Sequence, residues 1–353
     1  MEGTLLVTGG AGFIGSAVVR HLIAGTRARV VNVDALTYAA SPESVADAAT
    51  SPRYDFARVD VRDGAALTDL LARHGPVAVL HLAAETHVDR SIDGPATFLD
   101  TNVVGTLMLL EAVRDYWTGL RAEAREGFRL LHVSTDEVYG SLGRQGVFTE
   151  ESPYRPRSPY AATKAAADHL VMAWHHTYGV PAMVTNCSNN YGPYQFPEKL
   201  IPHMILSALE DRPLPVYGDG RQVRDWLHVD DHARALLAVL GRGRPGEVYN
   251  IGARSERTNL EVVEAICDLL DELRPRPGGE RHRERITHVA DRPGHDRRYA
   301  IDPRKVEDET GWRAELAFEE GLAATVRWYL ENEAWWSPIR SNRYRGERLG
   351  WSA

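Results

Sequence analysis

Cysteine, basic charge and long apolar runs are all scarce in this sequence. Only two cysteines, Cys187 and Cys267, occur in 353 residues, which excludes a disulfide framework and indicates a reducing compartment. The formal net charge of −8 argues against a nucleic-acid partner, because nucleic-acid-binding domains usually carry a basic excess. We find no basic-then-apolar leader before the strand-like segment 4–8 and no apolar run approaching about 18 residues. We therefore expect a cytoplasmic protein that binds neither nucleic acid nor membrane.

Short apolar strands alternate with helical patterns through the first half of the chain, which is typical of βαβ units and a parallel sheet. The predicted strands are 4–8, 29–33, 54–59, 77–82, 129–134 and 181–187, and the predicted helices are 13–25, 64–73, 94–117 and 158–178. After about residue 188, turn-rich pieces alternate with helices near 198–209, 230–240, 258–273 and 318–331. The sequence predicts an α/β protein with a Rossmann-type doubly wound parallel sheet over 1–188, to which some later segments return. A smaller, irregular α/β lobe is predicted over 189–353.

Three glycines follow the first predicted strand at three-residue spacing. They are Gly9, Gly12 and Gly15, and Phe13 and Ile14 open the helix between the last two. Glycine lets the backbone approach a pyrophosphate, whose charge the helix N-terminus then meets. Such turns also serve tight packing, so the glycines alone do not define a cofactor site.

The ends of three further strands complete the predicted dinucleotide site. Asp34 ends the second strand, where a carboxylate binds the ribose 2′-hydroxyl and repels a 2′-phosphate, which favours NAD over NADP. Asp60 and Val61 end the third strand and are candidates for an adenine contact. Ala83 and Ala84 follow the fourth strand and are candidates for the pyrophosphate. An equally good interpretation makes Asp60 the N-cap of the next helix.

Tyr160 and Lys164 stand four residues apart on a predicted helix, and therefore on one helical face. A nearby ammonium favours the phenolate, which lowers the pKa of a tyrosine toward neutral pH. The pair suits proton removal from a sugar hydroxyl while hydride leaves its carbon, and Lys164 can also hold the nicotinamide ribose. Read alone, the pair is a common surface pattern. Its place one helix after Ser134 and Thr135, at a strand end, favours catalysis.

Two adjacent carboxylic acids, Asp136 and Glu137, follow that strand end. An alcohol oxidation does not need them, and they indicate acid and base work on neighbouring carbons of the same substrate. Adjacent carboxyls in a closed pocket disfavour double ionisation, so one neutral acid at pH 7 is reasonable and the pair titrates as a unit. The alternative is a turn and helix cap that faces water.

These residues resemble those of the extended short-chain dehydrogenase/reductases that act on nucleotide sugars, and within them the dTDP-glucose 4,6-dehydratases. The blocks that carry the resemblance are STDEVYG at 134–140, ETHVDRS at 85–91, CSNNYGPY at 187–194, FPEKLIP at 196–202, VRDW at 223–226, DRPGHD at 291–296 and the pair Trp328–Tyr329. The resemblance therefore covers nearly the whole chain.

The resemblance implies a mechanism for the catalytic set. Tyr160 takes the proton of the C4 hydroxyl while hydride moves to NAD, Thr135 hydrogen-bonds the C4 oxygen, and Lys164 supports Tyr160. Glu137 then removes the C5 proton, and protonated Asp136 donates to the departing C6 hydroxyl. Return of hydride to C6 gives a 4-keto-6-deoxy sugar.

The resemblance also implies a substrate site and a homodimer formed through the helices at 94–117 and 158–178. The residues expected to line dTDP-glucose are Ser134, Thr135, Asn189, Glu198, Lys199, Leu200, Pro215, Tyr217, Arg224, Asn259, His295 and Tyr299. Arginine suits the diphosphate through bidentate hydrogen bonds, whereas Tyr299 is equally well read as a core aromatic. The chain departs from the family pattern at Asn186, where arginine is usual, at Ala40–Ser41, where Gly-Asn is usual, and in the Arg-rich loop 274–285.

Other functions remain open at this point. A nucleotide-sugar 4-epimerase needs only Thr135, Tyr160 and Lys164, and a uronic acid decarboxylase needs a cation for the C6 carboxylate. A non-catalytic NAD-sensing regulator has no need of the Tyr160 and Lys164 pair. We predict no metal site, because the histidines at 228–232 match no zinc spacing, and we expect Asp230–Asp231 to cap a helix. We interpret Trp335–Trp336 as a packing anchor. The sequence does not choose between dTDP and UDP with certainty, nor name the pathway that uses the product.

Overall fold

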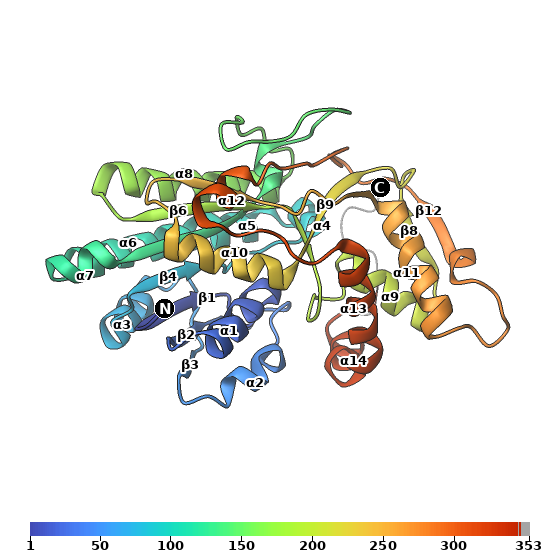
Figure 1. Cartoon of the computed structure of the whole chain (residues 1–353), viewed down its shortest axis with the longest axis horizontal. Coiled ribbons are helices and arrows are strands. Elements are labelled where there is room, and N and C mark those ends of the chain that lie inside the picture. Colours follow the sequence, from blue (N-terminus) through green and yellow to red (C-terminus); the bar gives the residue numbers. More distant parts are fainter. Residues whose placement is uncertain (345, 347–353) are drawn as a thin grey trace.

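The computed structural model describes residues 1–344 and 346, so the last residues of the predicted second lobe, 345 and 347–353, lie outside the described part. Within it, seven parallel strands form the central sheet in the order β3-β2-β1-β4-β5-β6-β10 (Figure 1). The strands are β1 (Thr4–Thr8), β2 (Arg29–Val33), β3 (Tyr54–Ala57), β4 (Ala78–His81), β5 (Arg129–Thr135), β6 (Ala182–Cys187) and β10 (Val248–Ile251). This is the doubly wound order with one strand added, so the predicted Rossmann-type fold is confirmed.

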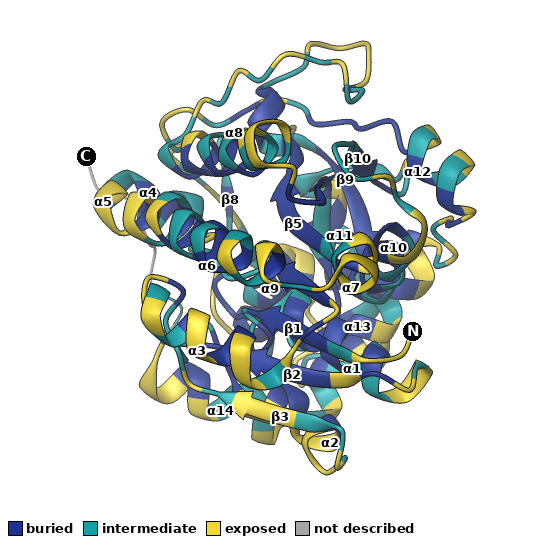
Figure 2. Cartoon of the chain, turned by 90° about the vertical axis from the view of Figure 1, so that its left-hand side faces the viewer, coloured by how far each residue is buried: buried dark blue, intermediate teal, exposed yellow. Residues whose placement is uncertain are grey.

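Helices cover both faces of the sheet. One face carries α1 (Phe13–Gly25), α2 (Ala46–Ala49), α10 (Val229–Arg242) and α12 (Arg304–Thr310), and the other carries α3 (Gly64–His74), α6 (Thr106–Thr118) and α8 (Pro159–Tyr178). Successive strand residues alternate between the two faces. Leu5 and Val7 therefore belong to the core beneath α1 and α10, whereas Leu6 belongs to the core beneath α3 and α6. Buried strands run between these helical layers (Figure 2).

The segment after residue 188 returns to this sheet. β10 pairs with β6 in parallel, with Asn250 beside Asn186, and α10 packs against α1. The expectation that later segments rejoin the first domain thus has a structural counterpart in 229–251.

The predicted helix 94–117 is present as the helical run Pro95–Thr118, whose middle part is a π-type segment. A separate helix, α4 (Val88–Asp93), precedes it, and Gly94 ends α4 before Pro95 opens α5 (Pro95–Phe98). The chain then makes a wide π-type segment, η2 (Leu99–Gly105), before α6. Proline fits the first turn of a helix but cannot continue one, which explains the break.

The run Pro95–Thr118 passes the length and composition test for a membrane span, with a mean hydropathy of 1.3. The expectation that no apolar run reaches that length is therefore wrong by this test. The helix packs on α3 and α8, and 44 % of its most apolar window is buried in the fold. Packing within the protein thus accounts for part of its apolar composition.

A smaller lobe lies beside the sheet (Figure 1). It holds a mixed sheet of β7 (Asn189–Tyr191), β9 (Val223–His228) and β11 (Glu256–Thr258), and a parallel pair of β8 (Leu214–Tyr217) and β12 (Ile286–Val289). Its helices are α9 (Leu200–Leu209), α11 (Asn259–Leu273), α13 (Phe318–Glu331) and α14 (Glu333–Asn342). These elements share one hydrophobic core, and Trp335 and Trp336 pack against it as expected. Shorter elements are η1 (Pro42–Val45), α7 (Ala122–Gly127), η3 (Asp136–Tyr139) and η4 (His282–Arg285).

Candidate active site

The glycine turn after β1 has room for no side chain at two of its positions. A Cβ on Gly15 would lie 2.0 Å from the carbonyl oxygen of Gly9. Gly9 itself has a φ of +71°, and a Cβ there would lie 2.7 Å from the amide nitrogen of Ala83. Gly12 precedes α1, whose first residues are Phe13 and Ile14, and no side chain caps this helix. The uncapped helix N-terminus at a close-approach turn is the cradle that a pyrophosphate requires.

Asp34 lies directly after β2 and is buried. Its two carboxylate oxygens accept hydrogen bonds from the backbone N–H groups of Ala11 (3.0 Å) and Leu36 (2.8 Å). Burial raises the pKa of Asp34, and these two donors act in the opposite direction. The carboxylate is thereby fixed beside the glycine turn, where it suits a ribose hydroxyl. These residues fit a dinucleotide.

Asp60 does not cap the helix that follows it, so that alternative interpretation is wrong. Asp63 caps α3 by accepting from the Ala66 N–H, whereas Asp60 forms an ion pair with Arg62. The contact of Asp60 and Val61 with adenine stays a prediction. Ala84 and its neighbour Ala83 follow β4 at the same edge of the sheet, next to the glycine turn.

Tyr160 and Lys164 are both buried in the first half of α8. Ser158 caps this helix and Pro159 occupies its first position, which fixes where the tyrosine stands. Burial, and then the charge of Glu137, raise the pKa of Tyr160 well above its ordinary value. The predicted direction, a lowering by Lys164, is therefore wrong for this structure. The Lys164 Nζ donates to the carbonyl oxygen of Val133 at 2.9 Å.

Asp136 and Glu137 open the 3₁₀ turn η3, and Thr135 caps it by accepting from the Glu137 N–H at 3.3 Å. The pair is a helix start, but it does not face water, since Asp136 is only 1 % exposed and Glu137 is partly buried. Burial and the neighbouring Glu137 raise the pKa of Asp136 well above its usual range. Burial also raises the pKa of Glu137, whereas the charges of Arg292, Arg224 and Lys199 lower it. The pKa is thus raised at both carboxyls, well above the usual range at Asp136, which makes Asp136 the better candidate for the neutral acid.

Cationic side chains from two segments act on this pair, and an aromatic side chain from a third lies beside one of them. Arg224 on β9 is buried, donates to the Asp296 carbonyl oxygen at 2.9 Å and lies 4.2 Å from the centre of the Tyr299 ring. Tyr299 donates to the Asp296 carboxylate at 2.6 Å. Lys199, just before α9, donates to the Thr86 carbonyl oxygen at 2.9 Å. The structure thus brings Arg224, Lys199 and Tyr299 to one region.

The remaining predicted substrate residues occupy varied positions. Tyr217 donates to the Asp89 carboxylate at 3.1 Å, and burial lowers the pKa of the nearby His295 to about 4. Glu198 accepts from Tyr38 (2.9 Å) and Arg90 (3.0 Å). The others lie on or next to secondary structure: Asn189 on β7, Leu200 at the start of α9, Pro215 on β8 and Asn259 at the start of α11.

Ser134 does not direct its hydroxyl outward. Its Oγ donates to the carboxylate of Asp168 at 2.8 Å, and both side chains are buried. The geometry favours a supporting role for Ser134 over the predicted substrate contact.

Arg292 is a site residue that sequence reasoning did not single out. It donates to the Asp89 carboxylate at 2.8 Å and acts electrostatically on Glu137. It stands inside the block DRPGHD, so its signal was present in the sequence, but its partner lies 203 positions away in the chain.

Within residues 1–344 and 346, no group of three histidine, cysteine or acidic side chains is placed to hold a metal. The helix-capping role expected of Asp230–Asp231 is wrong, because His228 caps α10 by accepting from the Asp230 N–H. Asp231 instead accepts from the backbone N–H groups of Glu315 and Leu316.

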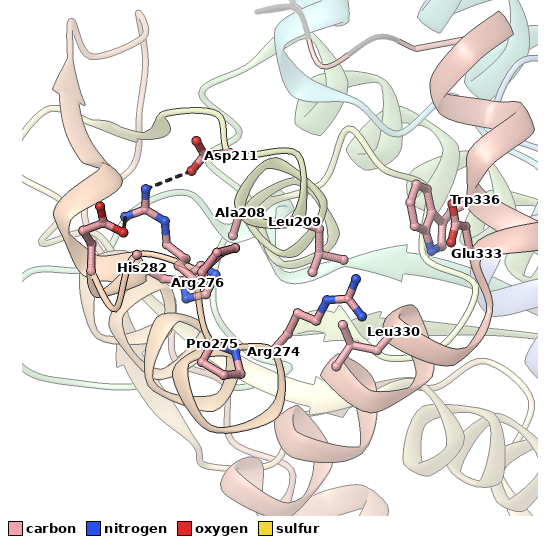
Figure 3. A pocket seen from close by; sticks show the side chains of 13 residues that line it. Ala208, Leu209, Asp211, Arg274, Pro275, Arg276, His282, Leu330, Glu333 and Trp336 are labelled. Atoms are coloured by element: carbon pink, nitrogen blue, oxygen red, sulfur yellow. Dashed lines mark ion pairs between the residues drawn. The ribbon is translucent and has the colours of Figure 1, made fainter.

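A pocket of about 570 Å³ lies apart from this site, beside the loop 274–285 (Figure 3). Arg276 and Asp211 form an ion pair at its rim, and Leu209, Leu330 and Trp336 line its opposite side. None of the predicted site residues lines it.

The sheet, the glycine turn and the Tyr160–Lys164 pair define a dinucleotide-dependent enzyme of the short-chain dehydrogenase/reductase class. The profile of the family described as GDP-mannose 4,6 dehydratase matches residues 6–325. A dTDP-glucose 4,6-dehydratase of Xanthomonas campestris pv. campestris is 59 % identical over 347 residues, which cover 98 % of this chain and 99 % of that protein. The dTDP-glucose 4,6-dehydratase 1 of Escherichia coli K12 is 56 % identical over 350 residues, covering 97 % of this chain and 96 % of that protein.

Solved structures give the same result. DesIV, a dTDP-glucose 4,6-dehydratase from Streptomyces venezuelae with NAD and TYD bound, superposes with a TM-score of 0.87 at 47 % identity, covering 95 % of this chain and 99 % of that one. A UDP-glucose 4-epimerase of Thermus thermophilus in complex with NAD has a TM-score of 0.81 at 31 % identity, with 93 % and 99 % covered. The chain belongs to the dTDP-glucose 4,6-dehydratase family.

Proposed function

We propose that this chain catalyses the NAD-dependent dehydration of dTDP-glucose to dTDP-4-keto-6-deoxyglucose. The observation that carries the proposal is the buried Asp136–Glu137 pair at the end of β5, next to Tyr160 and across the sheet edge from the glycine turn. Full-length relatives named for this reaction support it. NAD fits the glycine turn and Asp34, and when bound it accepts hydride from C4 and returns it to C6.

The chain's own residues handle the protons. Tyr160 removes the proton of the C4 hydroxyl, and the Thr135 hydroxyl hydrogen-bonds the same oxygen. The resulting ketone acidifies the proton on C5, which Glu137 removes as general base. Neutral Asp136 donates its proton to the C6 hydroxyl, and the C6–O bond breaks with loss of water. The buried pair thus supplies one acid and one base, although burying two carboxyls side by side costs free energy.

The diphosphate of the substrate serves for binding, and the reaction leaves it unchanged. Arg224 carries a buried guanidinium group and Arg292 a half-buried one, and guanidinium groups suit bidentate contacts with phosphate oxygens. Their charges also oppose the burial that raises the pKa of Glu137, so the same cations act on the substrate phosphates and on the base.

Three other functions of this fold compete with the proposal. A 4-epimerase has no use for an acid at C6, and the neutral Asp136 argues against it. A uronic acid decarboxylase would place a cation at C6 rather than Asp136. A non-catalytic NAD sensor has no need of the buried Tyr160 and Lys164. We keep dTDP over UDP because the most similar relatives described above are named for dTDP-glucose.

A homodimer and a cytoplasmic location are part of the proposal. Leu99 and Val104, on the π-type segment next to α6, are 52 % and 40 % exposed, which suits a face that another copy covers.

The test is incubation with dTDP-glucose, UDP-glucose and UDP-glucuronate in turn, followed by alkali and the absorbance of the 4-ketone. We expect the strongest absorbance of the 4-ketone with dTDP-glucose. Turnover of a UDP-sugar without any signal from dTDP-glucose would reject the proposal.

A further inference from the structure

A buried polar cluster lies behind Lys164, in the interior of the sheet domain. The Nε2 atom of His132 is 3.3 Å from the Nζ of Lys164 and 3.2 Å from an Oδ1 of Asp168. Asp168 stands one turn after Lys164 on α8, and its other oxygen accepts from Ser134 (2.8 Å) and Tyr154 (3.0 Å). Histidine, lysine and aspartate are all buried, so their charges are poorly screened.

His132 connects the two charged groups through a single atom. Burial, and then Lys164, lower the pKa of His132 well below its ordinary value, so the ring is neutral and carries one N–H. With the hydrogen on Nδ1 the Nε2 atom accepts from Lys164, and its approach to Asp168 is a close contact, since that carboxylate oxygen has no hydrogen-bond partner among the described residues. The Nδ1 atom has no hydrogen-bond partner among the described residues, so neither tautomer is fixed from that side.

Asp168 is the group that most favours the charged form of Lys164. Burial lowers the pKa of Lys164, and among the charges acting on it Asp168 raises it most, followed by Cys187 on β6. A buried ammonium without a counter-charge loses its proton. Burial raises the pKa of Asp168 to about 6, although Lys164, Ser134, Tyr154 and His169 each act to lower it.

We propose that Asp168 is a positioning residue for the C4 oxidation, supplying the buried negative charge that holds the Lys164 ammonium one helical turn from Tyr160. This proposal rests on the proposed function for its catalytic consequence, but not for its geometry. The contacts of Asp168 are with His132, Ser134 and Tyr154, and its effect on the reaction passes through the charge of Lys164. The Ser134 hydroxyl donates a hydrogen bond to the same carboxylate, and the supporting role of Ser134 is to hold that carboxylate in place.

The charge of Lys164 can be observed directly, because the chain has few lysines. It contains only three lysines, Lys164, Lys199 and Lys305. Lys305 lies elsewhere, paired with Glu247 at 2.7 Å, and serves as an internal reference. Biosynthetic ¹³Cε-lysine labelling therefore yields three signals, which Lys→Arg variants assign.

The principal variant is Asp168→Asn, which removes the charge and keeps the shape. We expect the Lys164 signal to titrate about one to three pH units lower than in the wild type, with Lys305 unchanged. The kcat for dTDP-glucose should fall because the Lys164 ammonium is lost, while KM changes by less than about threefold. Tyr154→Phe is the matched control, because it removes a neutral donor to the same carboxylate and should leave the Lys164 titration in place.

A second measurement needs no variant. In the wild type, protonation of Asp168 near pH 6 should give the Lys164 signal a small second inflection that Lys305 lacks. An unshifted Lys164 titration in Asp168→Asn, or, should that variant not fold, a wild-type signal without the second inflection, overturns the proposal. If the wild-type Lys164 signal shows the second inflection but the protein does not convert dTDP-glucose, the proposed function is wrong and the role of Asp168 stands.

Discussion

Glu137 raises the pKa of its neighbour Asp136, and this relationship divides the work of the two carboxyls. Burial, and then Glu137, raise the pKa of Asp136 well above its usual range, whereas the charges of Arg292, Arg224 and Lys199 oppose the burial that raises the pKa of Glu137. Two acids of the same chemical type thus have different surroundings, which favours Asp136 as the acid and Glu137 as the base. The predictions below follow from that division.

Replacing one carboxyl at a time should separate proton removal from water loss. We expect Asp136→Asn to reduce kcat by about 10²–10⁴-fold, because the C6 hydroxyl loses its acid, while exchange of the C5 proton with D₂O continues. Glu137→Gln should reduce the exchange itself. The measurement is ¹H NMR of the C5 position, with Tyr160→Phe as the control that blocks both steps. Loss of exchange in Asp136→Asn with normal exchange in Glu137→Gln would reverse the assignment.

The two raised pKa values predict opposite limbs of the pH profile. Glu137 acts as a base, so activity is lost as the pH falls through its pKa, which lies above that of an ordinary glutamate. Asp136 acts as an acid, so activity is lost as the pH rises through its own, higher pKa. A bell-shaped kcat profile is the expected result, and a profile that only rises with pH would contradict a neutral Asp136.

The same shift makes a prediction about stability. A carboxyl whose pKa is raised by folding stabilises the protein below its ordinary pKa, and this stabilisation disappears as the pH rises through the folded value. Asp136→Asn should therefore melt higher than the wild type at pH 8, by about 2 °C or more, and show a smaller difference at pH 5. Thermal unfolding at the two pH values checks this. An equal difference at both would mean that Asp136 is not neutral in the fold.

The glycine turn can be tested with two alanines in one helix. Gly15→Ala places a Cβ 2.0 Å from the Gly9 carbonyl oxygen, so we expect loss of bound NAD and destabilisation of about 1–3 kcal/mol. Gly25→Ala, at the other end of α1, meets nothing within 4 Å and should leave NAD content unchanged. Calorimetric titration with NAD measures both. Equal affinity in the two variants would place the cofactor elsewhere.

The proposed dimer depends on an exposed apolar face. Leu99→Glu together with Val104→Glu should shift the molar mass measured by light scattering from two chains to one, because charges in the contact would be desolvated. Val77→Glu, also on an exposed apolar side chain (44 %), is the control and should leave the mass unchanged. A wild-type protein of one chain in solution would reject the dimer outright.

Local patterns explain what the sequence could predict. β1 and β2 have the expected bounds because each is a short apolar run between breakers, and Gly9 and Gly15 follow from spacing alone. The π-type segment inside the predicted helix 94–117 follows from no spacing pattern in the sequence. The roles of Arg292 and Asp168 could not be predicted, nor that the Ser134 side chain points into the protein. In each case the partner residues lie far away in the chain. The direction of the Tyr160 pKa depends on burial, which no spacing reveals.

The central claim is most directly tested with dTDP-glucose that carries deuterium at C4. A dehydratase that moves hydride from C4 to C6 yields a product whose new C6 methyl group contains that deuterium, and ²H NMR or mass spectrometry of the product locates it. We predict the label in the methyl group of a 4-keto-6-deoxy sugar. A label that remains at C4 of an epimerised sugar, or a product with no methyl group, would contradict the account.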